Sequence, residues 1–194
     1  MPTLRPGILE WVSEEVLKWT NDADSAYLGA RVCLSRSLPG PFHTLAHIAI
    51  ERYLKGILHG DDSDAHSGVV LRKDFGHDLA RLVAAASRNH PLLADTEIRT
   101  ACAALWAEFD SGRYLVTADV ELLTTDKHIN TLSELNKLEV FDNLICTIRN
   151  EVVEHLTEGE RDQSMLAAIG SARLSQWREP FELGNLALSK FRGI

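Results

Sequence analysis

Two histidines, a glutamate and a lysine follow one another at intervals of four residues in the first third of the chain. On a helix they form one polar ridge, made of His43, His47, Glu51 and Lys55. Two histidines at this spacing can bind a metal ion, but a tetrahedral site needs further ligands and the sequence offers no obvious one. The other interpretation is an exposed ridge with an ion pair between Glu51 and Lys55. We expect this one and predict no metal site.

A second candidate pair, Arg149 and His155, lies in the last third of the chain. An imidazole can accept a proton near neutral pH, and a guanidinium can hold a phosphate with two hydrogen bonds. Residues six apart on a straight helix point about 120° away from each other, so these two cannot both reach one small target from a single helix. Either His155 is a core histidine hydrogen-bonded to Glu151, or its face of the helix meets a partner chain, where the histidine of one copy meets the arginine of the other.

The neighbouring residues leave alternatives open. Arg149 could be a surface arginine paired along its own helix, but no residue three or four positions away is acidic, which favours a functional role. Asn150 is either a solvated helix residue or a supporting member of the site. Arg113 and Tyr114 follow a Ser-Gly pair, and they are either a loop anchor or a phosphate contact beside a stacking ring.

Helical periodicity dominates the elements that position these residues. Apolar side chains at intervals of three and four predict a helix from Phe42 to Leu58, preceded by Pro39, Gly40 and Pro41. The same pattern predicts a long helix from Val12 to Cys33, bent near Asn21 and Asp22. The short link between these two helices makes them antiparallel neighbours.

The rest of the chain follows the same logic. Residues 60–67 read as a solvated loop, and residues 114–123 as a segment that could form an extended arm. Further helices are predicted over residues 79–90, after a cap at Asp95, from a capping box at Thr131 and Glu134 to a stop at Gly159, over residues 163–177, and after Pro180. His77 and Asp78 most simply start the helix at residue 79.

The composition indicates a single globular domain without staples. The chain has 194 residues, of which 45% are hydrophobic, and a formal net charge of −8, which argues against coating DNA or an anionic membrane by charge alone. Three separated cysteines indicate a reduced compartment. The sequence has neither the pattern of a secretory leader nor a long apolar run, so we predict a cytoplasmic protein without membrane contact.

Several of these residues resemble the HEPN family of small α-helical modules. The likeness lies in Trp19, Ala23, Asp24, Ala26 and Ala30, in residues 49–58 (AIERYLKGIL), and in residues 76–82 (GHDLARL). Many members of that family also carry an arginine, a polar residue and then a histidine in a late helix, and RNEVVEH over residues 149–155 is similar to this pattern. His47 and Ile48 depart from the family pattern, because many members have two glutamines at these positions.

The resemblance implies an all-α, up-and-down bundle with a core over about residues 12–157 and a helical extension over about residues 160–194. It also implies a metal-independent endoribonuclease with a toxin-like or defence role, which needs no cofactor. Arg149 and His155 would be catalytic in a cleft of a homodimer, and Asn150 would support them. A toxin would have an antitoxin as its partner. The alternative is a non-catalytic HEPN module that binds a nucleotide or a nucleotidyltransferase partner, and a helical interaction protein is a third interpretation.

Overall fold

The computed structural model describes residues 6–36, 38–114, 138–170, 178–182, 185 and 187–192. Every regular element within these residues is a helix, so the expected all-α bundle is confirmed. Within the same residues, no helix is both long enough and apolar enough to cross a membrane.

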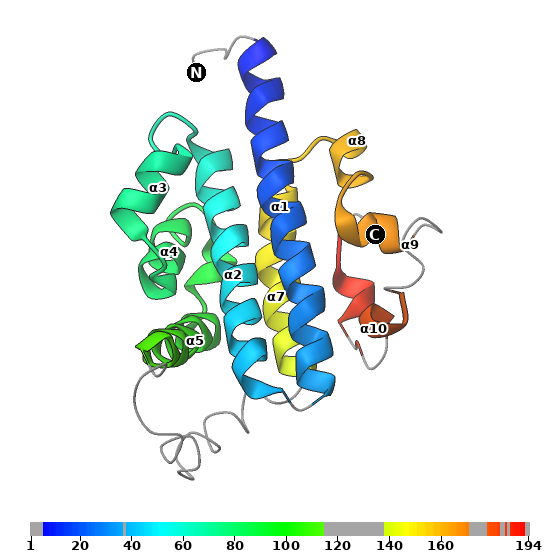
Figure 1. Ribbon diagram of the computed structural model, residues 1–194. Helices are drawn as coiled ribbons and strands as arrows, with labels where there is room; N and C mark the ends of the chain where they lie inside the picture. Colours follow the sequence, from blue (N-terminus) through cyan, green and yellow to red (C-terminus); the bar gives the residue numbers. More distant parts are fainter. Residues whose placement is uncertain are drawn as a thin grey trace.

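Two long antiparallel helices form the centre of the bundle (Figure 1). Helix α1 spans Pro6–Ser35 and continues through Asn21 and Asp22, and α2 spans Pro39–Asp61, as its apolar stripe predicts. The link between them is short, because Pro39 starts α2 only a few residues after α1 ends.

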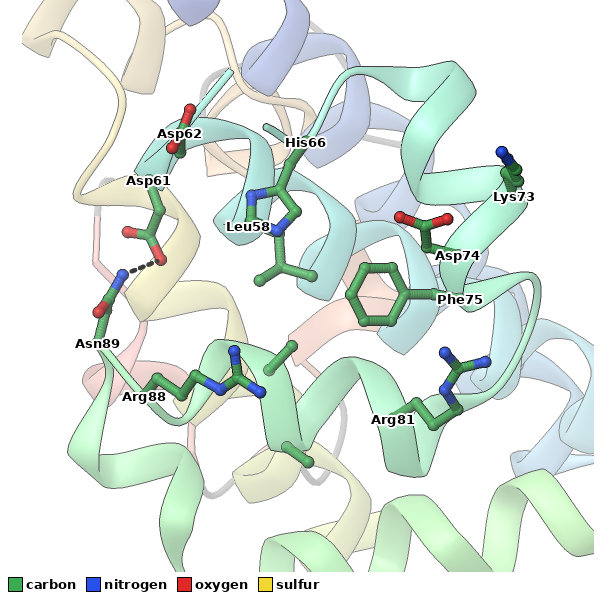
Figure 2. A pocket seen from close by; sticks show the side chains of 12 residues that line it. Leu58, Asp61, Asp62, His66, Lys73, Asp74, Phe75, Arg81, Arg88 and Asn89 are labelled. Atoms are coloured by element: carbon green, nitrogen blue, oxygen red, sulfur yellow. Dashed lines mark hydrogen bonds between the residues drawn. The ribbon is translucent and has the colours of Figure 1, made fainter. Parts of the chain in front are cut away.

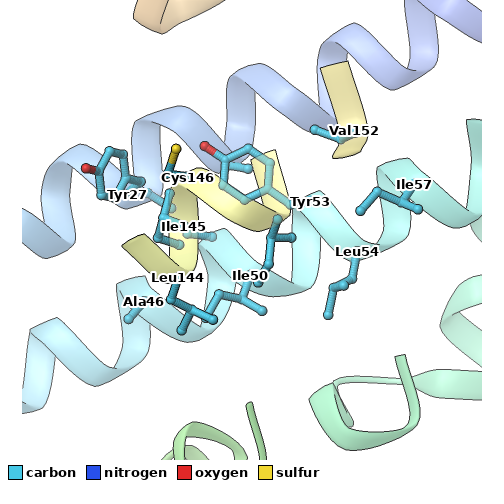
Figure 3. Close-up of a cluster of buried hydrophobic side chains, with 14 of the residues drawn as sticks. Tyr27, Ala46, Ile50, Tyr53, Leu54, Ile57, Leu144, Ile145, Cys146 and Val152 are labelled. Carbon is cyan, nitrogen blue, oxygen red and sulfur yellow. The ribbon is translucent and has the colours of Figure 1, made fainter. Parts of the chain in front are cut away.

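Helix α7, Leu138–Val153, packs against this pair. Near its start, the ring of Phe141 lies 5.2 Å from that of Phe42, at the beginning of α2. Near its end, Val152 lies so close to Gly56 that a Cβ at this glycine would stand 2.9 Å from the Val152 side chain. Helices α2 and α7 therefore run in the same direction and end at the same edge of the molecule, with their apolar side chains between them (Figure 3).

Shorter helices flank this centre on two sides (Figure 1). Beside α2 lie α3 (Gly68–Phe75), α4 (Leu79–Ala86), a 3₁₀ turn (Pro91–Ala94) and α5 (Thr96–Tyr114). On the α1 side lie α8 (Glu158–Arg161), α9 (Met165–Gly170) and α10 (Arg178–Glu182), followed by a 3₁₀ turn at Leu188–Lys190. The sequence pattern did not predict α3.

The helix ends show which local signals were decisive. Asp95 accepts hydrogen bonds from the backbone N–H groups of Glu97 and Ile98, as expected of the cap of α5. The expected stop at Gly159 is wrong, because α7 already ends at Val153 and Thr157 forms a capping box that starts α8. The predicted cap at Thr131 and Glu134, the arm after Tyr114 and residues 171–177 lie outside the described residues.

The flanking C-terminal helices share the apolar core of the central helices. The ring of Tyr27 on α1 lies 6.3 Å from Phe181 and 6.0 Å from Phe191. A buried ion pair between Arg31 and Asp142 lies beside these rings, and Arg31 also donates to the backbone carbonyl of Phe181. Residues of α10 and beyond thus cover polar and aromatic groups of α1 and α7.

Candidate functional site

The polar ridge of α2 is buried rather than exposed. His43, His47, Glu51 and Lys55 are 8%, 0%, 5% and 5% exposed, because α4 and α5 pack across this part of α2. The prediction of an exposed ridge is therefore wrong. The ridge is buried by helices α4 and α5, which lie far from it in the sequence, so the local spacing of residues does not show this burial.

Glu51 is the centre of this ridge. One carboxylate oxygen accepts a hydrogen bond from Nζ of Lys55 at 2.5 Å, and the other lies 2.9 Å from Nδ1 of His77 and 3.5 Å from Nε2 of His47. We call these four residues the Glu51 cluster. His77 is the additional group that the sequence did not reveal, and it comes from the turn between α3 and α4.

The charge state of the Glu51 cluster follows from these contacts. Burial raises the pKa of Glu51, but the hydrogen bonds from His47, His77 and Lys55 outweigh burial and hold this pKa at about 2. The ring of His47 stacks on Phe109, with centroids 3.8 Å apart. The cluster thus balances a buried carboxylate with a lysine ammonium.

Arg149 is fully buried, and its guanidinium is surrounded by partners. Its Nε donates to Asp24 at 3.0 Å, one terminal nitrogen donates to the carbonyl of Arg192 at 2.7 Å, and the other donates to Ser164 at 3.0 Å. Asp24 also accepts from the hydroxyl of Tyr53 at 2.6 Å. The acidic partner that is missing along the helix of Arg149 is therefore supplied by α1.

The other predicted site residues take separate positions. Asn150 is held by the C-terminal segment, because its amide donates to the carbonyl of Lys190 and accepts from the N–H of Arg192. Arg113 and Tyr114 belong to the last turn of α5 rather than to a loop, and their side chains lie outside the described residues. Among the side chains that the structure describes, neither Arg149 nor Asn150 has a hydrogen bond or ion pair with His155.

His155 lies two residues beyond the end of α7, in a turn against the last residues of α2. Its ring rests on Gly60, where an added Cβ would stand 2.4 Å from the ring carbon Cγ. Its Nε2 lies 3.6 Å from Oδ1 of Asp61. The parallel direction of α2 and α7 explains this meeting, since both helices end at this edge.

A second imidazole completes this group. His90, which follows α4, has Nε2 at 3.0 Å from the same Asp61 oxygen and Nδ1 at 2.6 Å from Glu151. We call Asp61, His90, Glu151 and His155 the Asp61 cluster. The expected partner of His155, Glu151, therefore pairs with His90 instead, and His155 faces Asp61.

The two imidazoles of the Asp61 cluster differ electrostatically. The hydrogen bond with Asp61 raises the pKa of His90, and the bond with Glu151 adds to this against the effect of burial. Burial lowers the pKa of His155, and nearby Asp61 only partly offsets it. Burial also raises the pKa of Asp61, but hydrogen bonds from His90 and Asn89 outweigh it, so that this pKa is lowered and the group is a carboxylate.

A polar pocket of about 850 Å³ lies between the end of α2 and helices α3 and α4. Asp61 lines one edge, where its second oxygen accepts a hydrogen bond from Asn89 (Figure 2). Three exposed cations, Lys73, Arg81 and Arg88, also line it. Asp61 therefore belongs both to the pocket and to the imidazole pair.

The sequence does not predict that Asp61, His90 and Glu151 lie together in one site with His155. The only local signal was the acidic run that includes Asp61 and Asp62 at the end of a secure helix. His90 precedes a proline and was interpreted only as a helix end. The pairing depends on α4 and α7 ending at the same edge, which no spacing in the sequence reports.

Comparisons with known proteins give no relatives from which to transfer a role: no family model matches the chain, and no match is found among curated proteins or among solved structures.

Proposed function

We propose that this protein cleaves RNA beside the pocket at the end of α2, with His155 as the proton acceptor. The observation that carries the proposal is the position of its imidazole, which is 18% exposed and lies 3.6 Å from a carboxylate that lines a polar pocket. A histidine oriented by a carboxylate is a common general base. The resemblance to the HEPN family supports RNA as the substrate class.

The reaction needs no group other than the RNA and the protein. The imidazole of His155 takes the proton of the 2′-hydroxyl, and the resulting oxygen attacks the adjacent phosphorus. The bond to the 5′-oxygen breaks, that oxygen takes a proton from water, and the hydroxide that remains takes the proton from the imidazolium of His155. The products are a 2′,3′-cyclic phosphate and a 5′-hydroxyl end.

We assign the anion-binding role to Arg88 instead of Arg149. Arg88 is exposed and lines the pocket, whereas every guanidinium nitrogen of Arg149 already donates a hydrogen bond within the chain. A planar guanidinium stabilises the additional negative charge that develops on phosphorus during the reaction. The homodimer with Arg149 in a shared cleft remains a prediction, and it would require these bonds of Arg149 to break.

The test is cleavage of an RNA oligonucleotide by the purified protein with a chelator present. His155→Ala should lower the rate by about 100-fold or more, the range for loss of a general base, and Arg88→Ala by about 100-fold. Arg72→Ala is the matched control, because Arg72 is also exposed on this side but does not line the pocket. Cleavage by His155→Ala at the wild-type rate, or no cleavage by the wild type, would overturn the proposal.

A substrate control separates this chemistry from simple hydrolysis. An oligonucleotide with a single 2′-deoxynucleotide at the cleavage position lacks the nucleophile and should remain intact. If it is cleaved at the same rate, attack by the 2′-oxygen is excluded. Circular dichroism of each variant shows whether a loss of rate reflects a loss of fold.

A second candidate function is nucleotide binding without catalysis, as in the alternative HEPN interpretation. The pocket favours it, because its volume is of the size that ligand sites have and it combines three cations with the ring of Phe75. Calorimetric titration with nucleoside mono-, di- and triphosphates tests it. Binding that Arg81→Ala and Arg88→Ala abolish, in a protein that does not cleave RNA, would favour this function.

A further inference from the structure

We propose that Asp61, His90 and His155 form a binding site for one divalent ion of the zinc type. One possible ligand atom of each of the three residues lies within 4.8 Å of the others, and Oδ1 of Asp61 is 3.0 Å from Nε2 of His90 and 3.6 Å from Nε2 of His155. Two histidines and one carboxylate are a ligand set that zinc uses when it keeps a fourth position open. The site lies beside the pocket because Asp61 lines both.

One ligand atom lacks a partner. Nε2 of His155 is buried and forms no hydrogen bond among the described residues, although it lies 3.6 Å from Asp61. A buried polar atom without a partner costs about 1–3 kcal/mol, so such atoms call for an explanation. An ion between this nitrogen and Asp61 would satisfy it.

The groups behind the ligands are those that metal-bound residues use. Nδ1 of His90 lies 2.6 Å from Glu151, so with an ion bound the ring would donate there and direct its Nε2 lone pair to the ion in place of its hydrogen bond with Asp61. Asn89 donates to the second oxygen of Asp61 at 3.1 Å. Carboxylate and amide partners of this kind orient metal ligands and strengthen binding.

The charges also favour a cation. Asp61 and Glu151 place two negative charges around the ligand atoms, while both ligand histidines can be neutral. A dication would balance these two carboxylates. It would also take the place of any proton on Nε2 of His90, because a ring nitrogen binds a metal only when it is deprotonated.

A bound ion would control the reaction proposed above, and this consequence depends on that proposed function. A metal on Nε2 of His155 occupies the lone pair of the ring and leaves the other nitrogen protonated. The ring then accepts no proton from a 2′-hydroxyl. We therefore expect zinc to inhibit cleavage and a chelator to restore it.

The test measures metal binding directly, without RNA. Chelator-treated, tag-free protein is titrated with Co²⁺, followed by its visible absorption, and with Zn²⁺ in competition with a chromophoric chelator. The wild type should bind one equivalent. His90→Ala and His155→Ala should weaken binding at least about 100-fold, the upper end of the loss for an outer-shell partner.

The matched controls come from the Glu51 cluster, which also contains two histidines and a carboxylate. His47→Ala and His77→Ala should leave the affinity unchanged. A wild type that binds no ion, or binding that is lost in His77→Ala and kept in His90→Ala, overturns the metal site. If the ion binds as expected and RNA is not cleaved, only the proposed function and its inhibition fail.

Discussion

The Glu51 cluster and the Asp61 cluster each contain two imidazoles and one carboxylate of α2, in different settings. Each places one carboxylate of α2 between two imidazoles, and in each these atoms lie close enough to hold a metal ion. The fourth member differs, because Lys55 donates to Glu51 in one cluster and Glu151 accepts from His90 in the other.

This difference decides what each cluster can do. The ammonium of Lys55 neutralises Glu51 within the protein, so an added dication would bring two uncompensated charges into a buried region. Glu151 instead adds a negative charge beside a partly exposed imidazole pair. The charge of the residue behind the ligands, more than the ligands themselves, therefore decides whether such a cluster favours a bound cation.

The largest expected effect is on stability and tests the structural role of the Glu51 cluster. Glu51→Gln should lower the free energy of unfolding by about 3–5 kcal/mol, because it leaves the buried ammonium of Lys55 without a counter-charge. Urea unfolding at neutral pH measures this loss. Asp61→Asn is the control and should cost much less, since His90 keeps Glu151; equal losses would remove the distinction.

The pH dependence of stability should come from the same residue. The lowered pKa of Glu51, about 2, means that its contribution is complete above the unfolded-state value near 4.5 and is lost as the pH falls toward 2. The wild type should therefore lose on the order of 3 kcal/mol more than Glu51→Gln across this interval. Urea midpoints between pH 5 and pH 2.5 measure it, and parallel curves for both proteins would contradict it.

Glu151→Gln tests whether the charge behind the ligands matters in the Asp61 cluster. The amide retains a hydrogen-bond acceptor for His90 but removes the charge, so divalent affinity should fall about 10- to 100-fold. The cobalt titration described above measures it. Glu154→Gln is a matched control, since Glu154 is exposed and pairs with Arg192 instead; an equal loss in the control would show only a change in surface charge.

Gly60→Ala should give a smaller loss of stability than Glu51→Gln and acts through geometry alone. Its Cβ would stand 2.4 Å from Cγ and 2.9 Å from Cβ of His155, so the turn must shift together with the ring, and we expect a loss of about 1–3 kcal/mol in stability. Divalent binding and cleavage should fall more clearly, because the ring leaves Asp61. Unchanged affinity would show that the ring position is not important.

The sequence predicted the bundle because apolar periodicity is a local property. The stripe of α2 appears in the residues themselves, and the caps at Asp78 and Asp95 act within one turn. The candidate site was predicted only in part. His155 was identified, but its neighbours depend on contacts across 29 and 61 residues around His90, which spacing along one helix cannot report.

Arg149 shows the opposite case. No residue three or four positions from Arg149 is acidic, and this favoured a functional role. The missing charge is Asp24, 125 residues earlier in the chain, and Asp24 was one of the residues that carried the family resemblance. Local sequence does not show whether a charged residue is buried, because its partner can lie on any helix.

The bonds of Arg149 also set an order of events during synthesis. Asp24 leaves the ribosome early, yet its arginine lies on α7, and that arginine in turn needs the carbonyl of Arg192. Until translation has passed residue 149, the nascent chain carries this carboxylate, on a part of its first helix that becomes buried, without its native cation. Helices α1 and α2 can pair beforehand, but the hydrogen bonds that join Asp24, Arg149 and the carbonyl of Arg192 are complete only after residue 192 has been made.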